Sequence, residues 1–454
     1  MVYGAEHDPQ YFARYAEPET KLASAIDGGY FAALVVPACR EQLGFLEGYE
    51  PALRRSAGRV LLVLVINGAD DASPETHAEN QRMLSDLALR FGDRRLLSAP
   101  GVSTDAWLAR DEHFELLWLD RASPGLRLPR GEGVGMARKV GADLAALLWS
   151  RGQIHCPQIA CGDADASLPS DYFARLAIGA AEPEASTALL WPFQHEPGGD
   201  RAIDAATVLY EISLRYYVLG LSAARSRYAY QSIGSSLSFD AAAYASVRGF
   251  PKRAAAEDFY LLDKLAKVGP LRRVAGAPLT LRARASDRVP FGTGRGTREI
   301  AELRARGGDF ELYSPELFRA LEAVLRGLDA FADSAQPEAL RRALSQQVPE
   351  LASTAIGVLE RLKVFEALIA ATSQAPKGAV LRRRVHTWFD ALRTLRFMHE
   401  LRGAGLASLP WSEALAAAPF LSEPFRDGPS PEAVCARLAL AEAALPALVG
   451  PTLP

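Results

Sequence analysis

Residues Val60–Ile66 read VLLVLVI, and residues Phe31–Pro37 read FAALVVP. Each run has the length of a strand and carries no charged side chain, so we expect protein to cover both of its faces. Unbroken apolar strands of this kind are typical of parallel sheets that are flanked by helices. The two runs therefore predict an α/β fold.

Further apolar runs alternate with helical patterns over the first ~300 residues, which predicts a mostly parallel sheet with helices on both faces. The runs are Phe114–Leu119, Ile154–Cys161 and Thr187–Trp191. The helical patterns are Thr76–Arg90, Gly135–Trp149 and Ala205–Ser222. Ligands of open α/β sheets bind at the carboxyl ends of the strands. We therefore expect function at Pro37–Glu41, Asn67–Asp71 and Gly162–Asp165, which follow strands.

The pattern changes near residue 310, where helical spacing replaces strands. Ser314-Pro315-Glu316 predicts a helix start with a Ser cap, a Pro in the first turn and an acid near the positive end of the helix dipole. Further helices are expected at Pro337–Ser345, Ser353–Ala371, Val380–Arg402 and Pro431–Leu445, and no strand-like run follows residue 312. We predict an α/β domain over residues 1–309 and an all-helical domain over residues 310–454.

Composition narrows the class of protein. The chain has 454 residues, 49% of them hydrophobic and 23% charged, with a formal net charge of −3. This balance is ordinary for a globular protein and gives no basic surface for nucleic acid. We see no secretory signal and no apolar run long enough to span a membrane. Four scattered cysteines make no disulfide framework, so a cytoplasmic location with reduced thiols is expected.

The chemistry-bearing stretch is Cys161-Gly162-Asp163-Ala164-Asp165. Two carboxylates two residues apart, directly after a strand, can face one Mg²⁺ or Mn²⁺ ion, and such an ion neutralises a diphosphate. A solvated acidic turn is the alternative on these residues alone.

Gly131–Gly141 (GEGVGMARKVG) is a poor match to a dinucleotide fingerprint, because Met136 stands where a glycine is needed. The segment instead predicts a loop that opens a helix carrying Arg138 and Lys139. These cations could face a diphosphate beside the amide donors of the helix start. A solvated basic helix face is the alternative.

Two more segments bear on chemistry. Glu257 and Asp258 open an amphipathic helix, where a positioned carboxylate can act as a general base toward a hydroxyl group; helix capping alone also explains acids there. Ser232–Ser236 is a small-residue turn that a ligand can approach closely. In Ser286–Gly294, Arg288 offers a planar donor for phosphate, and a plain surface loop is equally consistent with these residues.

The order of these motifs along the chain resembles the order in the family 2 glycosyltransferases of the GT-A fold, which is a Rossmann-like architecture. The resemblance covers about residues 30–290 and is most specific at Gly162–Asp165 and Gly234–Leu262. It implies metal-dependent transfer of a sugar from a nucleotide-sugar donor to an acceptor hydroxyl group, with inversion as the family expectation. The helical C-terminal extension and Ser286–Gly294 are similar to a bacterial subgroup of this family.

The resemblance also implies roles for single residues. The residues that it implies for donor binding are Pro37, Glu41, Asn67, Asp70, Arg138, Asp163 and Arg288. The implied metal ligands, for Mn²⁺ or Mg²⁺, are Asp165, Asp163 and Asp287. Asp287 or water would replace the late histidine ligand of many GT-A enzymes, because no histidine lies between His195 and His386. Asp258 is the implied catalytic base, and Glu257 is its neighbour in the acceptor site.

Two other functions stay open. A nucleotidyltransferase that makes a sugar nucleotide would need a glycine-rich basic signature after the first strand, and Pro37–Glu41 lacks the glycines. A non-catalytic scaffold would use the helical domain to bind a partner or to form a homo-oligomer. The acceptor, whether a saccharide, a lipid or a small molecule, has no readable signature in the sequence.

Overall fold

The computed structural model describes residues 9–182, 186–286, 292–375, 377–421 and 430–449. Contacts divide the chain into two compact units. The N-terminal unit comprises Met1–Asp204 and Ser232–Gly296, and the C-terminal unit comprises Ala205–Gln231 and Thr297–Pro454.

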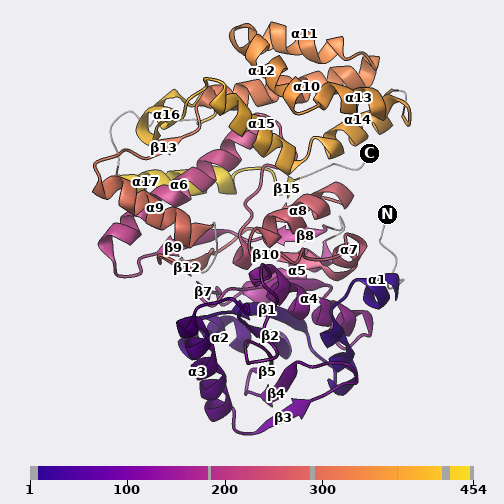
Figure 1. Ribbon diagram of the computed structural model, residues 1–454, viewed down its shortest axis with the longest axis vertical. Helices are drawn as coiled ribbons and strands as arrows, with labels where there is room; N and C mark the ends of the chain where they lie inside the picture. The colour runs from indigo at the N-terminus through magenta and orange to yellow at the C-terminus, as the bar shows by residue number, and fades with distance from the viewer. Residues whose placement is uncertain (1–8, 183–185, 287–291, 376, 422–429, 450–454) are drawn as a thin grey trace. The chain divides into compact units, whose positions relative to one another are not determined.

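The N-terminal unit is built on a large mixed sheet that is largely parallel at its core (Figure 1). Its strands lie in the order β11-β8-β10-β6-β1-β2-β5-β4-β3. Strands β6, β1, β2 and β5 run parallel to one another. The bounds are β1 Ala32–Ala38, β2 Val60–Asn67, β3 Arg94–Leu97, β4 Asp105–Arg110, β5 Phe114–Arg121, β6 Gln158–Cys161, β8 Ala188–Leu190, β10 Leu237–Asp240 and β11 Leu271–Arg273. Every residue of β1 and β2 is buried, as their apolar sequences predict.

The sheet has more antiparallel pairs than the sequence predicts. β10 runs antiparallel to both β6 and β8, and β4 runs antiparallel to both β3 and β5. A second, small sheet orders β7 (Ala166–Ser167), β12 (Leu279–Arg282) and β9 (Phe193–Glu196). These strands are short and carry polar residues, so no long apolar run marks them in the sequence.

Helices cover both faces of the sheet core. On one face, α4 packs against β1 and β2, and a Cβ at Gly141 would lie 2.5 Å from Cγ1 of Val35. Val36 is the neighbour of Val35 in β1, so its side chain points to the other face of the sheet. There, Tyr49 of α2 and Val36 both lie next to Gly162, which places α2 on that face. The α-helices of this unit are α1 Pro9–Arg14, α2 Leu46–Arg54, α3 Pro74–Arg90, α4 Val134–Ser150, α5 Tyr172–Ala181, α7 Ala241–Ser246 and α8 Glu257–Val268, with 3₁₀ turns at Pro18–Ala25, Leu43–Phe45 and Gly234–Ser236.

The C-terminal unit is rich in helices that surround one apolar core. Contacts join α10 to α11, α11 to α12, and α10 to α14. The predicted cap is confirmed, because the Ser314 side chain accepts a hydrogen bond from the Glu316 amide at 3.3 Å. The helices are α10 Pro315–Ser334, α11 Glu338–Gln347, α12 Pro349–Arg361, α13 Val364–Thr372, α14 Ala379–Trp388, α15 Ala391–Gly403, α16 Trp411–Ala417 and α17 Pro431–Ala443.

Three details of the C-terminal prediction are wrong. Lys363, with a φ of 57°, separates α12 from α13 where one helix was expected. Asp390 accepts the Arg393 amide at 3.0 Å and starts α15, so the predicted helix Val380–Arg402 is also two helices. The region is not all-helical, because β13 (Glu311–Leu312) pairs with β14 (Leu409–Pro410), and β15 covers Leu448–Val449. Strands of two residues leave no periodic signal.

Contacts also assign part of the middle of the chain to the helical unit. Most of α6 (Arg201–Ala223) and of α9 (Thr293–Ala305) belongs there rather than with the sheet. Ile212 and Tyr216 of α6 share an apolar core with Phe318 of α10. The sequence-based boundary between residues 309 and 310 does not anticipate this insertion.

No helix in the described part of the chain is long and apolar enough to cross a membrane.

We predict that Gly141→Val destabilises the N-terminal unit. The added carbons would meet Val35, Val63 and Val65, which are all fully buried. Overpacking a filled core costs about 1–3 kcal/mol. Gly357→Val, in α12, is the matched control because a Cβ there meets only an Arg361 nitrogen, at 3.8 Å. Urea unfolding should show a lower midpoint for Gly141→Val alone, and equal midpoints for the two variants would contradict the packing argument.

Candidate active site

The acidic turn after β6 lies at the carboxyl edge of the parallel core. The amide of Ala166 donates to the Asp163 carbonyl at 2.9 Å, which closes the turn. The hydroxyl group of Tyr49, from α2, donates to the same carbonyl at 2.5 Å. Because Tyr49 is fully buried, a side chain of α2 that solvent does not reach holds the backbone of this turn.

Arg138, in the first turns of α4, joins this turn to the start of α8. Its Nη2 donates to Asp163 at 2.6 Å, its Nε donates to Glu257 at 2.8 Å, and its Nη1 donates to the Gly162 carbonyl at 3.2 Å. Arg138 is 2% exposed. Burial alone would lower its pKa, but the carboxylates of Asp163 and Glu257 raise the pKa above its usual range. The guanidinium group is therefore a fixed positive charge.

Close packing fixes the orientation of Arg138. A Cβ at Gly234, in the small-residue turn before β10, would overlap Nη2 of Arg138, so only glycine leaves room for the guanidinium group. The neighbouring Lys139 makes different contacts, with Asp143 and the Tyr11 hydroxyl group, each at 2.9 Å. Both cations are buried, so the alternative of a solvated basic helix face is wrong.

The start of α8 positions the acidic pair. Ala256 has a φ of 60°, a left-handed conformation that costs a non-glycine residue on the order of 1 kcal/mol. It directly precedes Glu257, which is buried against Arg138, and Asp258, which is partly exposed. Arg40, with a φ of 58°, likewise directly precedes Glu41. Backbone strain thus accompanies both of these acidic segments.

A second arginine, Arg284, completes the charged cluster. It follows β12 and donates to both carboxylate oxygens of Glu41, at 2.8 and 3.1 Å. Its Nη2 also lies 2.6 Å from Asp165. Sequence reasoning missed Arg284, because Arg282 and Arg284 both stand in the run Leu281-Arg282-Ala283-Arg284 and only the pairing of β12 shows which one reaches the acids.

Among the residues that the structure describes, the cluster holds more negative than positive groups. Its members are the carboxylates of Glu41, Asp163, Asp165, Glu257 and Asp258 and the guanidinium groups of Arg138 and Arg284. Burial raises the pKa of Asp163 to about 6, with Arg138 opposing and Asp165 adding to the rise. Burial, and then the nearby Glu257, raise the pKa of Asp258 to about 7. The site therefore favours a further cation or proton.

Other predicted donor-binding residues lie outside this cluster. Pro37 is buried in β1, and Asn67 donates its side-chain amide to the Ala38 carbonyl at 3.1 Å. Asn67 thus ties the ends of β1 and β2 together, while Asp70 is exposed. No ion pair or hydrogen bond of the described residues links Asn67 or Asp70 to the clustered carboxylates. Asp287 and Arg288 lie outside the described residues.

The donor set fits a magnesium or manganese ion only in part. Asp163 and Asp165 offer the hard oxygen ligands that these ions prefer. Within the described ranges, however, no three His, Cys, Asp or Glu side chains are arranged to hold a metal ion. Mg²⁺ is commonly bound by one or two carboxylates together with substrate phosphates and water. The site fits that kind of shared coordination.

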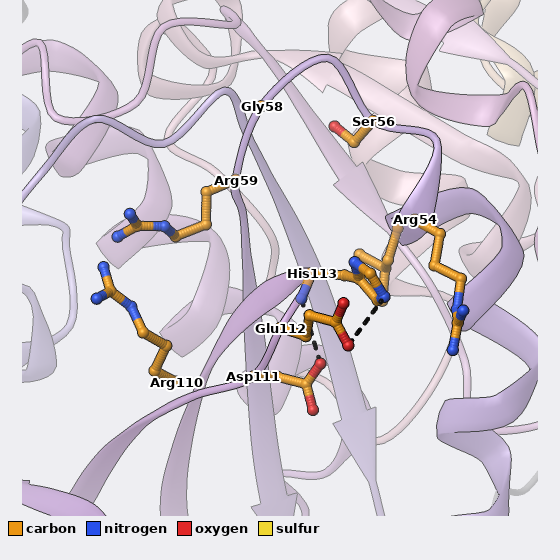
Figure 2. Close-up of a pocket in the computed structure, with 9 residues that line it drawn as sticks. Arg54, Ser56, Gly58, Arg59, Arg110, Asp111, Glu112 and His113 are labelled. Carbon is orange, nitrogen blue, oxygen red and sulfur yellow. Dashed lines mark hydrogen bonds and ion pairs between the residues drawn. The ribbon is translucent and has the colours of Figure 1, made fainter.

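A separate pocket of about 520 Å³ lies at the opposite, amino edge of the sheet. Gly58 and Arg59 precede β2, and Asp111–His113 precede β5. Figure 2 shows Arg59 and Arg110 on one side of this pocket and Arg54 on the other. None of the residues that the sequence singles out for function lines it.

No protein-family model matches the chain, and a search of curated proteins finds no match.

The raised pKa values predict a pH-dependent stability. The folded-state pKa of Asp258 lies above the usual unfolded value of about 3.9, so the free energy of unfolding falls as the pH rises from about 3.9 to about 7 and stays lowered above that. Asp258→Asn removes this cost, and the Asn oxygen can still accept the Phe259 amide. In urea titrations at pH 4.5, the free energy of unfolding of the variant should be equal to or lower than that of the wild type. At pH 8 it should be more stable by on the order of 1 kcal/mol.

Asp86→Asn is the control, since Asp86 is an exposed residue of α3. It should follow the wild type at both pH values. A stability difference between Asp258→Asn and the wild type that does not change with pH would contradict the raised pKa.

Proposed function

We propose that this chain is a glycosyltransferase with a GT-A-type domain, which transfers a sugar from a nucleotide-sugar donor to an acceptor hydroxyl group. One observation carries the proposal. The Arg138 guanidinium group contacts Asp163 at 2.6 Å and Glu257 at 2.8 Å. Arg138 thereby holds two segments in one site at the carboxyl edge of the sheet. The acidic turn at Asp163 suits a metal diphosphate, and the start of α8 at Glu257 suits an acceptor.

The leaving nucleoside diphosphate needs compensation of its negative charge. Arg138 and Arg284 are the cations of the cluster, and planar guanidinium groups suit phosphate oxygens. Asp165 and Asp163 would hold a Mg²⁺ or Mn²⁺ ion, which supplies further charge neutralisation when it is bound. Among the described residues, the cluster has five carboxylates and two guanidinium groups, which favours a metal diphosphate over a free anion.

Asp258 fits the role of general base. A base works best when its pKa lies near the working pH, and burial raises the pKa of Asp258 to about 7. The residue Asp258 is partly exposed, whereas Glu257 is buried and paired with Arg138. Asp258 would accept the proton of the acceptor hydroxyl group as that oxygen attacks the sugar. A single displacement of this kind inverts the anomeric centre.

The proposal predicts donor turnover that depends on Mn²⁺. The full chain, tested against a panel of sugar nucleotides with Mn²⁺, should show thermal stabilisation and slow release of a nucleoside diphosphate with at least one donor. Asp165→Ala should reduce that release by about a hundredfold or more, because it removes charge compensation at the leaving group. Asp258→Asn should retain donor binding.

Asp171→Asn is the matched control, because Asp171 is an exposed acid six residues beyond Asp165 that pairs with Arg175. It should behave as the wild type does. Absence of binding across the whole panel would overturn the proposal. Release of pyrophosphate instead of a nucleoside diphosphate would identify a nucleotidyltransferase.

The pKa of Asp258 predicts the pH profile of transfer. The base must be ionised, so the turnover rate at saturating substrate should rise with pH up to about 7 and then level off. Asp258→Asn should lower the rate by roughly 10²–10⁴-fold and remove this rise. A wild-type rate that falls between pH 6 and pH 8 would contradict the role of Asp258.

A further inference from the structure

Arg284 lies beside Asp165, the carboxylate that would hold a metal ion under the proposed function. Its guanidinium group pairs with Glu41 through two hydrogen bonds, and its Nη2 lies 2.6 Å from the Asp165 carboxylate. Burial alone would lower the pKa of Arg284, but Asp165 and Glu41 raise it above its usual range. The carboxylate expected to bind a metal ion thus already has a positively charged partner.

The backbone that carries Arg284 is anchored close to the acidic turn. The Arg282 amide donates to the Asp165 carbonyl at 3.0 Å, and the Ala283 amide donates to the Glu196 carbonyl at 2.9 Å. β12 also pairs with β7, the strand that directly follows Asp165. The position of Arg284 beside Asp165 is therefore set by sheet pairing rather than by the ion pair alone.

The two arginines of the cluster differ in their freedom to move. The Arg138 side chain is 3% exposed and contacts three groups, so it has a fixed structural position. The Arg284 side chain is 31% exposed, and Asp165 is 26% exposed. A partly exposed arginine that follows an anchored strand can change partners without disturbing the core.

A metal ion and the Arg284 guanidinium group would compete for the same carboxylate oxygens. Ions such as Mn²⁺ need deprotonated oxygen ligands, and each oxygen engaged by a guanidinium group is less available to a cation. A diphosphate changes this balance, because it offers Arg284 oxygens of higher charge than a carboxylate and offers the metal ion additional ligands.

We propose that Arg284 closes the metal position while no nucleotide is bound, and that the donor diphosphate opens it by drawing the guanidinium group away from Asp165 and Glu41. This inference rests on the proposed function. It makes metal and donor binding mutually dependent, since each favours the arrangement that the other requires. It also makes Arg284 a specificity-determining residue that selects a metal–diphosphate complex over a free metal ion.

Mn²⁺ binding to the full-length protein without substrate tests this directly. The free Mn²⁺ ion can be followed by electron paramagnetic resonance at pH 7.5. Wild-type protein should bind Mn²⁺ weakly, and Arg284→Gln should bind it on the order of tenfold more tightly, the size expected for removal of a charge-assisted hydrogen bond. Arg282→Gln removes the same charge from an exposed position two residues away and should match the wild type.

The second arm of the test adds a nucleoside diphosphate, either uridine or guanosine diphosphate. It should tighten Mn²⁺ binding to the wild type, and this gain should shrink in Arg284→Gln. If the wild type gains Mn²⁺ affinity from a nucleoside diphosphate but Arg284→Gln binds Mn²⁺ alone no better than the wild type does, the role of Arg284 is refuted and the proposed function stands. If neither diphosphate binds to the wild type with Mn²⁺, and the sugar-nucleotide panel is also negative, the proposed function fails together with this inference.

Discussion

The buried guanidinium group of Arg138 is the interaction on which the candidate site depends. It lies in α4, which packs on β1 and β2, and it holds Asp163 after β6 and Glu257 at the start of α8. Removing one partner of a buried ion pair leaves an uncompensated charge and typically costs about 3–5 kcal/mol. Sheet, helix and acidic turn therefore form one electrostatic unit, in which Gly234 makes room for the arginine.

In the described part of the chain, carboxylates outnumber guanidinium groups in this unit, and the function that we propose depends on this excess of negative charge. Raised pKa values at Asp163 and Asp258 show that ionised carboxylates are unfavourable there without another cation. Left-handed backbone at Arg40 and Ala256 adds local strain beside Glu41 and Glu257. Stability given up at a site of this kind is often recovered when the ligand binds.

The sheet core and the acidic segments of the site could be predicted from the sequence, because hydrophobic periodicity and residue chemistry mark them. The runs at β1 and β2 identified the sheet core, and Gly162–Asp165 and Glu257-Asp258 identified segments that the fold brings together through Arg138. Sequence reasoning could not find Arg284, since choosing between Arg282 and Arg284 requires the register of β12. Nor could it foresee that Asn67 ties strand ends together, because a side chain's partner depends on tertiary packing.

Diffraction from crystals grown with Mn²⁺ and a nucleoside diphosphate would show whether the acidic turn binds a metal diphosphate, because the anomalous signal of manganese locates the ion independently of any assumed role. We expect one manganese peak within coordination distance of the Asp165 carboxylate, with the diphosphate beside it and Arg284 moved from Asp165 toward the phosphate oxygens. A nucleotide bound at the arginine-lined pocket before β2 and β5, with no manganese at the acidic turn, would contradict this expectation.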